Sequence, residues 1–394
     1  MLSKEVMNNM SRSLLMKVMP EHAQRLIEAY GVDKVYDFSL GSPDIEPSKK
    51  VRDSLNKIIL ENRPNIHSHT STLGNEEVRT LIASSIKKES GVNINKQHIV
   101  MTYGASGAMN VVLKTILNPG EEVVVFSPYF VDYLAYIENN GGQGVVIPPN
   151  LPSFEPDPDV LYNAITPKTK AIIINSPNNP TGVVYGESIL KKIAKKFEMR
   201  EKEFVNTIYL IADESYKELV FDGVKVPEIL SIFKHAISIY SFSIALSLPG
   251  ERIGYIAVNP AIENNEEFME GLAYAQEILG FVNAPALFQK VLIESIDATV
   301  EVEEYKKRRD LLYGNLIEIG YKCNKPEATF YMFPQSPLLD DVEFCNRAMI
   351  HNLIFMPGKV FNCPGYFRIA YCMNNKMIEN SLSAFEALAN EFIK

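Results

Sequence analysis

The sequence contains two segments whose residue types are suited to binding a phosphate group. Segment 103–108, Tyr-Gly-Ala-Ser-Gly-Ala, lies between an apolar run and a helical pattern. Its small residues can expose backbone N–H groups at a helix N-terminus, which bind anions, although such turns also serve as plain strand-to-helix connections. Segment 241–255 holds Ser241, Ser243 and Arg252 around a Pro-Gly turn. Two hydroxyls and a guanidinium can converge there on one phosphate.

Charged and amide side chains follow or interrupt other apolar runs. Asp213 follows the run 208–212, and a carboxylate buried there needs a partner such as a cationic ring nitrogen. A helix N-cap is the alternative role for it. Segment 175–182, which includes Asn179, ends another run at the edge where open α/β sheets bind ligands, or else forms an Asx-Pro turn. Arg368 lies inside an apolar run, which implies a bound carboxylate from protein or ligand.

The elements that position these residues follow an alternating pattern. Short runs rich in β-branched residues recur between helical patterns at 99–102, 122–126, 171–175, 208–212, 236–240 and 253–258. This alternation predicts an α/β fold with a mostly parallel sheet covered on both faces. From about residue 285 the pattern changes to a charged helix, short β-like segments and a closing amphipathic helix. We expect a large α/β domain at 45–285 and a small α+β domain built from 1–44 plus 286–394.

Composition narrows the class of protein. The chain has 394 residues, 46% hydrophobic and 22% charged, as globular proteins do. A net charge of −9 argues against a nucleic-acid or anionic-membrane partner, and no apolar run is long enough for a membrane span. The four cysteines show no CxxC spacing, so we expect free thiols and no metal site. These features favour a cytoplasmic protein that binds small ligands.

As a set, these motifs resemble the class I and II aminotransferases, pyridoxal 5′-phosphate (PLP) enzymes of the aspartate aminotransferase fold, PLP-dependent fold type I. The resemblance runs in order from Leu-Gly-Ser-Pro-Asp at 40–44 to Arg368. It implies a mostly parallel seven-stranded sheet in the large domain, a smaller α+β domain and a homodimer. The implied activity is exchange of an amino group between an L-amino acid and a 2-oxoacid, with PLP as cofactor.

The resemblance also implies how residues would hold the cofactor. Phe130 matches the aromatic residue that stacks on the pyridine ring, and Asn179 and Tyr216 match the donors to its phenolic oxygen. Asp213 matches the carboxylate that keeps the ring nitrogen protonated, which makes the ring an electron sink. The phosphate contacts would come from Ala105, Ser106, Ser241, Ser243 and Arg252. For the substrate, Arg368 matches the arginine that grips the α-carboxylate, with Gly41 and Asn179 beside it.

The main departure from the family is Ile244, which stands where the family has the lysine that forms a Schiff base with PLP. Isoleucine has neither a nucleophile nor a titratable group, and losing a positioned acid–base group costs roughly a hundred- to ten-thousand-fold in rate. Lys217 directly follows Tyr216, but adjacent residues of a strand point to opposite faces, so it is a poor substitute. We expect an impaired copy of a working enzyme. The alternatives are a protein that binds PLP or pyridoxamine phosphate without turnover, and a β-lyase or decarboxylase of the same fold.

Two further departures concern specificity and assembly. His69 stands where the family usually has a tyrosine that reaches the phosphate of the neighbouring subunit's cofactor. Ser106 stands where some bacterial aspartate aminotransferases have a lysine for the distal carboxylate, so a strict preference for dicarboxylic amino acids is not expected. Tyr103, Tyr129 and Tyr133 would instead accept aromatic or aliphatic side chains.

Overall fold

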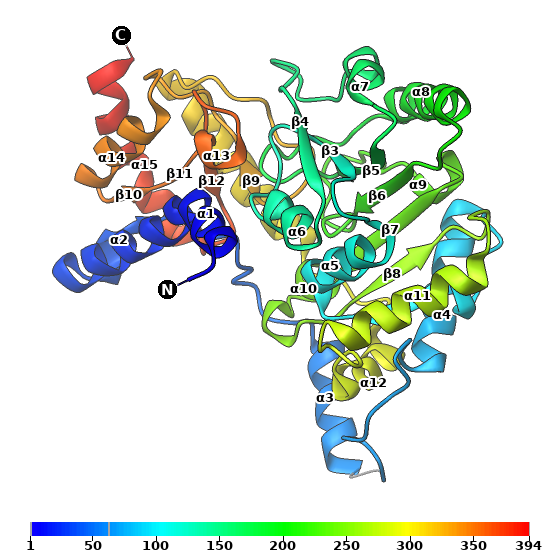
Figure 1. Ribbon diagram of the computed structural model, residues 1–394. Coiled ribbons are helices and arrows are strands. Elements are labelled where there is room, and N and C mark those ends of the chain that lie inside the picture. The colour runs from blue at the N-terminus through cyan, green and yellow to red at the C-terminus, as the bar shows by residue number, and fades with distance from the viewer. Residues whose placement is uncertain (1, 62–63, 394) are drawn as a thin grey trace.

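A seven-stranded sheet forms the centre of the computed structural model, which describes residues 2–61 and 64–393 (Figure 1). Strand β8 runs in the direction opposite to the other six strands, so the mostly parallel sheet is confirmed. The strands in spatial order are β2 (Ile99–Thr102), β8 (Gly254–Val258), β7 (Ala236–Ser241), β6 (Tyr209–Asp213), β5 (Thr169–Asn175), β3 (Glu122–Phe126) and β4 (Gln143–Ile147). Sequence analysis missed β4, an edge strand whose Gln-Gly start weakens its apolar pattern.

Helices cover both faces of this sheet because strand side chains alternate between two apolar clusters. In β6, Leu210 and Ala212 belong to one cluster and Ile211 to the other. The first face is covered by α3 (Lys49–Glu61), α4 (Glu76–Ser90), α7 (Pro158–Ala164), α8 (Glu187–Phe204), α9 (Ile229–Ile232) and α12 (Ala286–Ser295). The second face is covered by α5 (Gly104–Ile116), α6 (Tyr133–Asn139) and α11 (Asn265–Ile278). By the same alternation, Asp213 lies on the face of α5 and α6, and Glu214 on the face of α4.

A third apolar cluster forms the core of a smaller α+β unit that contains both ends of the chain (Figure 1). Its small sheets are the antiparallel order β11 (Met356–Pro357), β12 (Phe367–Ala370), β9 (Tyr331–Met332) and the parallel pair β1 (Tyr36–Asp37) with β10 (Leu353–Ile354). Its helices are α1 (Lys4–Arg12), α2 (Leu14–Tyr30), α13 (Val302–Ile319), α14 (Asp341–Ile350) and α15 (Asn375–Phe392). Stacked phenyl rings such as Phe355 and Phe385, 5.3 Å apart, fill this core.

The division between the two units at residue 285 remains a prediction. Helix α12 packs against α3 and α4, and its Val291 and Leu292 belong to the apolar cluster of the large sheet. We propose that the boundary falls after α12 rather than before it, because these side chains are buried against the large unit.

Short one-turn elements complete the chain: η1 (Val32–Lys34), η2 (Lys96–His98), α10 (Phe242–Ala245), η3 (Pro249–Glu251) and η4 (Gly358–Phe361). Over residues 2–61 and 64–393, no helix combines the length and apolarity that crossing a membrane requires. All four cysteines are free, and three of them are buried.

Candidate active site

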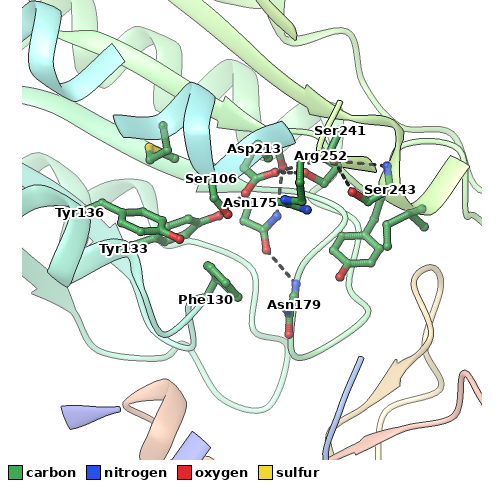
Figure 2. A pocket seen from close by; sticks show the side chains of 15 residues that line it. Ser106, Phe130, Tyr133, Tyr136, Asn175, Asn179, Asp213, Ser241, Ser243 and Arg252 are labelled. Atoms are coloured by element: carbon green, nitrogen blue, oxygen red, sulfur yellow. Dashed lines mark hydrogen bonds between the residues drawn. The ribbon is translucent and has the colours of Figure 1, made fainter. Parts of the chain in front are cut away.

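A cavity at the carboxyl edge of the large sheet collects ten of the twelve residues to which the resemblance assigns a catalytic, cofactor or substrate role (Figure 2). Those ten are Ala105, Ser106, Phe130, Asn179, Asp213, Tyr216, Ser241, Ser243, Ile244 and Arg252. Gly41 and Arg368 do not line it. Five further residues do, namely Met109, Tyr133, Tyr136, Asn175 and Ser215. Apart from Arg252, which lies just before β8, these residues lie at the ends of β5, β6 and β7 or in the segments that follow β2, β3, β5, β6 and β7.

The phosphate-type donors converge at the N-terminus of α5. Gly104, with φ +65°, starts this helix, and a Cβ there would lie 3.2 Å from Arg252 Nη2 and 3.5 Å from Ser241 Oγ. Ser241 Oγ in turn donates to Ser243 Oγ at 2.8 Å. Arg252 is exposed in the single chain and, within the described ranges, forms no ion pair; Nη1 donates to Pro249 O at 3.0 Å. Free helix N–H groups, hydroxyls and a guanidinium form an anion site together.

Asp213 is a buried carboxylate without a cation. Its side chain accepts from Tyr133 Oη at 2.7 Å and from Ser215 Oγ at 2.6 Å. No ion pair to it occurs among the described residues, and no helix begins after it, so the N-cap alternative is wrong. Burial raises the pKa of Asp213, and the hydrogen bonds from Ser215 and Tyr133 offset this only in part. A cationic ligand group would remove the cost of ionising this carboxylate.

Arg368 is also buried, at 2% exposure, and no carboxylate of the described chain pairs with it. Nη1 donates to Asn179 Oδ1 at 3.1 Å and Nη2 to Ser39 O at 2.7 Å, while Nε has no partner. The described part of the chain therefore does not supply the carboxylate that the sequence led us to expect for this arginine. Gly41 lies nearby against Tyr331, whose hydroxyl a Cβ at position 41 would overlap.

Segment 175–182 is a turn at the ligand-binding edge of the sheet, but it is not an Asx-Pro turn, because Asn179 Oδ1 accepts from Arg368 Nη1 and not from Thr181 N. Asn178 Oδ1 instead accepts from Thr181 N, three residues on, at 3.1 Å. Asn175 Oδ1 accepts from Asn179 N at 2.8 Å and so fixes the backbone of the residue that contacts Arg368. The turn therefore holds Asn179 at the cavity.

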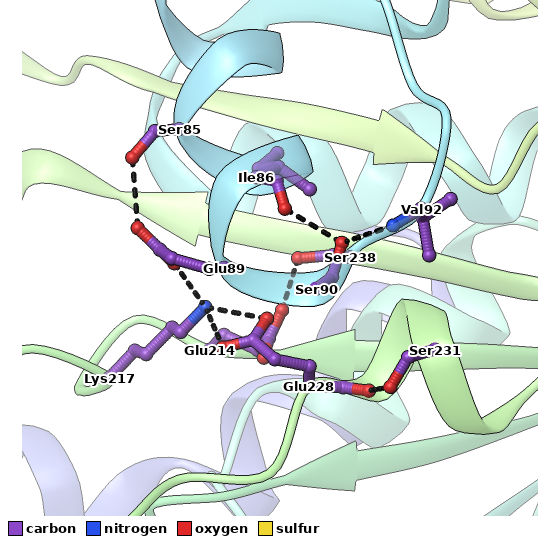
Figure 3. Close-up of polar contacts among 10 residues, drawn as sticks. All are labelled: Ser85, Ile86, Glu89, Ser90, Val92, Glu214, Lys217, Glu228, Ser231 and Ser238. Atoms are coloured by element: carbon purple, nitrogen blue, oxygen red, sulfur yellow. Dashed lines mark hydrogen bonds and ion pairs between the residues drawn. The ribbon is translucent and has the colours of Figure 1, made fainter.

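Ile244 lines the cavity at 7% exposure, and none of the described lining residues is a lysine. Lys217 lies outside it, with Nζ 3.0 Å from Glu89 Oε2 and 3.0 Å from Glu228 Oε1 (Figure 3). Burial would lower the Lys217 pKa, but the charges of Glu214 and Glu228 outweigh it and raise the pKa. A lysine held as a cation by carboxylates is not available to the cavity.

Of the three tyrosines expected beside the substrate, Tyr133 lines the cavity, whereas Tyr103 and Tyr129 do not, and sequence analysis gave no role to Tyr136 or Ser215. Tyr133 follows Phe130 by three positions, and their rings meet edge-on at 5.6 Å. Tyr133 and Tyr136 share one face of α6, which was the available signal. His69 is exposed, outside the cavity, with Nδ1 2.8 Å from Asn283 Oδ1, and the described residues hold no cluster of three metal-ligand side chains.

Comparison with known proteins identifies the class. The family model "Aminotransferase class I and II" matches residues 33–385, so the chain belongs to that family and is a PLP-dependent enzyme of the aspartate aminotransferase fold.

Individual relatives agree with this assignment. An amino transferase crystal structure from Eubacterium rectale is 34% identical, with full coverage of both chains and a TM-score of 0.95. The probable aspartate/prephenate aminotransferase of Thermus aquaticus is 30% identical over 90% of this chain and 91% of its own. The aromatic-amino-acid aminotransferase 2 of Thermococcus litoralis is 30% identical over 95% and 97%, respectively.

Proposed function

We propose that the cavity binds PLP or its amine form, pyridoxamine phosphate, together with an L-amino acid or 2-oxoacid, and that amino transfer is slow in this chain because Ile244 replaces the family's lysine. The observation that carries the proposal is Asp213, a buried carboxylate without a cation. It lines the same cavity as the α5 N-terminus, Ser241, Ser243 and Arg252. A pyridine ring that carries a phosphate can pair its protonated nitrogen with Asp213 and its phosphate with the donors at the α5 N-terminus.

The remaining lining residues fit the same ligand. Phe130 offers a ring face at the cavity, and Tyr216 and Asn179 offer hydrogen-bond donors to a phenolic oxygen. Arg368, with its unpartnered Nε, fits an α-carboxylate of the second substrate. When bound, PLP supplies the electron sink that stabilises negative charge at the substrate α-carbon. The chain's contribution is to hold the ring nitrogen protonated through Asp213 and to exclude water with Ile244 and Met109.

Ile244 favours a second candidate, a protein that binds the cofactor without turnover. Its side chain fills the wall of the cavity and offers no atom that can attack a carbonyl or move a proton. Both candidates share the ligand, and they differ only in whether an amino group is exchanged.

The deciding variant is Ile244→Lys, with Ile244→Met as a matched control of similar size and no amine. The amine should make PLP attach covalently after borohydride reduction, detected by mass spectrometry, and should raise amino-acid to 2-oxoacid exchange by roughly a hundredfold or more. The methionine variant should do neither. If the lysine variant attaches PLP yet exchanges no amino group with phenylalanine, leucine or aspartate, the transferase proposal fails and the binding proposal stands. Release of pyruvate and ammonia from a cysteine conjugate would instead indicate a β-lyase.

For the substrate, we propose an aromatic or aliphatic amino acid. The relatives carry names for aspartate, prephenate and aromatic amino acids, so family membership leaves the side chain open. Phe130, Tyr133 and Tyr136 give the described cavity an aromatic wall, and Ser106 offers no charge for a distal carboxylate. In the Ile244→Lys variant, phenylalanine should turn over faster than aspartate.

We further propose a homodimer in the cytoplasm. The exposure of Arg252 and His69 in the single chain is consistent with a second copy covering them, and four free cysteines favour a reducing compartment. Light scattering at micromolar protein should give twice the mass of one chain, and a monomer at all concentrations would contradict the dimer.

A further inference from the structure

A pair of buried phenols joins the cavity to Arg368. Tyr216 lines the cavity shortly after β6, and Tyr331 lies on β9 of the smaller unit. Their hydroxyl oxygens are 3.0 Å apart, at exposures of 9% and 3%. Each hydroxyl has this one hydrogen bond among the residues that the structure describes. The contact spans 115 positions of sequence, and Tyr331 itself does not line the cavity.

Tyr331 also contacts the arginine that fits a substrate carboxylate. The register Ala370↔Tyr331 places Tyr331 on the strand next to Arg368. The guanidinium carbon of Arg368 lies 4.5 Å from the centre of the Tyr331 ring, a cation–π contact. Gly41 leaves room for the Tyr331 hydroxyl, which a Cβ would displace. One side chain therefore contacts Arg368 with its ring and Tyr216 with its hydroxyl.

The direction of the phenol hydrogen bond follows from proton counting. Each hydroxyl has one proton to donate. If Tyr216 donates its proton to an oxygen of a ligand in the cavity, it can only accept from Tyr331. Tyr331 must then donate to Tyr216, and no other described acceptor competes for its proton.

We infer that Tyr331 is a positioning residue that acts through Tyr216: its hydroxyl orients the Tyr216 hydroxyl toward the cavity, while its ring holds Arg368. The inference deepens the proposed function and rests on it. Tyr216 would then donate more strongly to a ligand's phenolic oxygen, because an oxygen that accepts one hydrogen bond becomes a better donor in the next.

The test is a double-mutant cycle on the chain as given, in which no described residue of the cavity wall is a lysine that could attach the ligand covalently. Tyr331→Phe keeps the ring above Arg368 and removes only the hydroxyl. Calorimetric titration with pyridoxamine phosphate should show roughly fivefold weaker binding in Tyr331→Phe, the typical effect of one hydrogen bond. In a Tyr216→Phe background the same change should alter affinity by less than about twofold, because Tyr331 acts through Tyr216. The pH at which the absorbance spectrum of the bound ligand changes should also differ between Tyr331→Phe and the unsubstituted chain.

Tyr371→Phe is the matched control, since Tyr371 is a fully buried phenol that donates to Thr329 O at 2.8 Å outside the cavity. It should leave affinity and pH profile unchanged. The inference would be overturned if Tyr331→Phe lowered the affinity equally with Tyr216 present and in the Tyr216→Phe background, or did not change the affinity at all. The proposed function would still stand in that case, provided that the unsubstituted chain binds pyridoxamine phosphate. No binding to the wild type would overturn both. Should Tyr331→Phe not fold, Gly41→Ala displaces the same hydroxyl and should shift the pH profile in the same direction.

Discussion

Replacing Asp213 by asparagine should weaken ligand binding and stabilise the unliganded protein. Asparagine has the shape of aspartate and can still accept from Tyr133 or Ser215, but it carries no charge for a ring nitrogen. Removing one partner of a buried, hydrogen-bonded charge pair costs about 2–5 kcal/mol, which weakens pyridoxamine phosphate binding by roughly thirtyfold to several thousandfold.

The stability effect has the opposite sign. Because burial raises the pKa of Asp213 above its unfolded value, ionising it in the folded protein costs about 1.4 kcal/mol for every tenfold decrease in its acid dissociation constant. This cost is absent at pH values below the unfolded pKa and complete above the folded one. The advantage of Asp213→Asn in the free energy of unfolding should therefore grow as pH rises from about 4 to 7. With an unfolding entropy of about 2.1 cal/mol/K for each of 394 residues, every increase of about 1.4 kcal/mol in stability raises the thermal midpoint by less than about 2 °C, so urea titration is the better assay.

Glu214→Gln provides the control for Asp213→Asn. Glu214 is the next residue, is equally buried, and its pKa is also raised chiefly by burial, but it lies on the other face of the sheet against Ser238 (Figure 3). It should show the same pH trend in stability and keep ligand affinity within about twofold of wild type. Affinity of Asp213→Asn within about fivefold of wild type, or an equal loss in Glu214→Gln, would refute the assignment of Asp213 to a ligand cation.

Two further variants test the phosphate site and the cluster behind the sheet. Arg252→Gln should weaken pyridoxamine phosphate roughly tenfold or more and leave pyridoxamine, which lacks the phosphate, within about twofold; equal losses for both ligands would contradict a phosphate contact. Lys217→Met should lower the free energy of unfolding by about 2–3 kcal/mol at pH 7, because it leaves Glu89, Glu214 and Glu228 without their cation. Burial acts to lower the Lys217 pKa, but the nearby carboxylates raise it overall. The charged lysine therefore stabilises the fold fully at pH values below its unfolded pKa, and this contribution is lost only as the pH rises through the higher folded pKa. Urea titrations should thus show a constant difference between pH 7 and 9, and a difference that disappears by pH 9 would contradict this account.

Sequence analysis placed in the site the residues that stand at strand ends. It did not identify the contacts that distant segments of the chain make at the site. Asp213, Asn179 and Ser241 each stand at or just after the end of a β-branched run, and parallel strands bring such ends to one edge. The assignment of these residues to the cavity therefore needed only local patterns.

Contacts between distant segments were not predictable in this way. The Tyr133–Asp213 hydrogen bond joins residues 80 positions apart and depends on how α6 packs over β6. Tyr331 reaches Tyr216 only because β9 pairs with β12 in one register. The packing of α12 on α3 also has no local signal, because its apolar stripe would suit either unit.

Because β8 runs antiparallel to β7, the part of the cavity wall between these two strands is formed by one short, continuous segment of the chain. The chain leaves the sheet at Ser241 and re-enters at Gly254 on the same edge, without a crossover helix. Positions 243, 244 and 252 therefore belong to a local excursion whose closure entropy is small and whose ends are fixed by neighbouring strands. An exchange at position 244 changes the wall of the cavity while the pairing of β7 with β8 lies outside the exchanged segment, so we expect variants at this position to fold as the parent chain does.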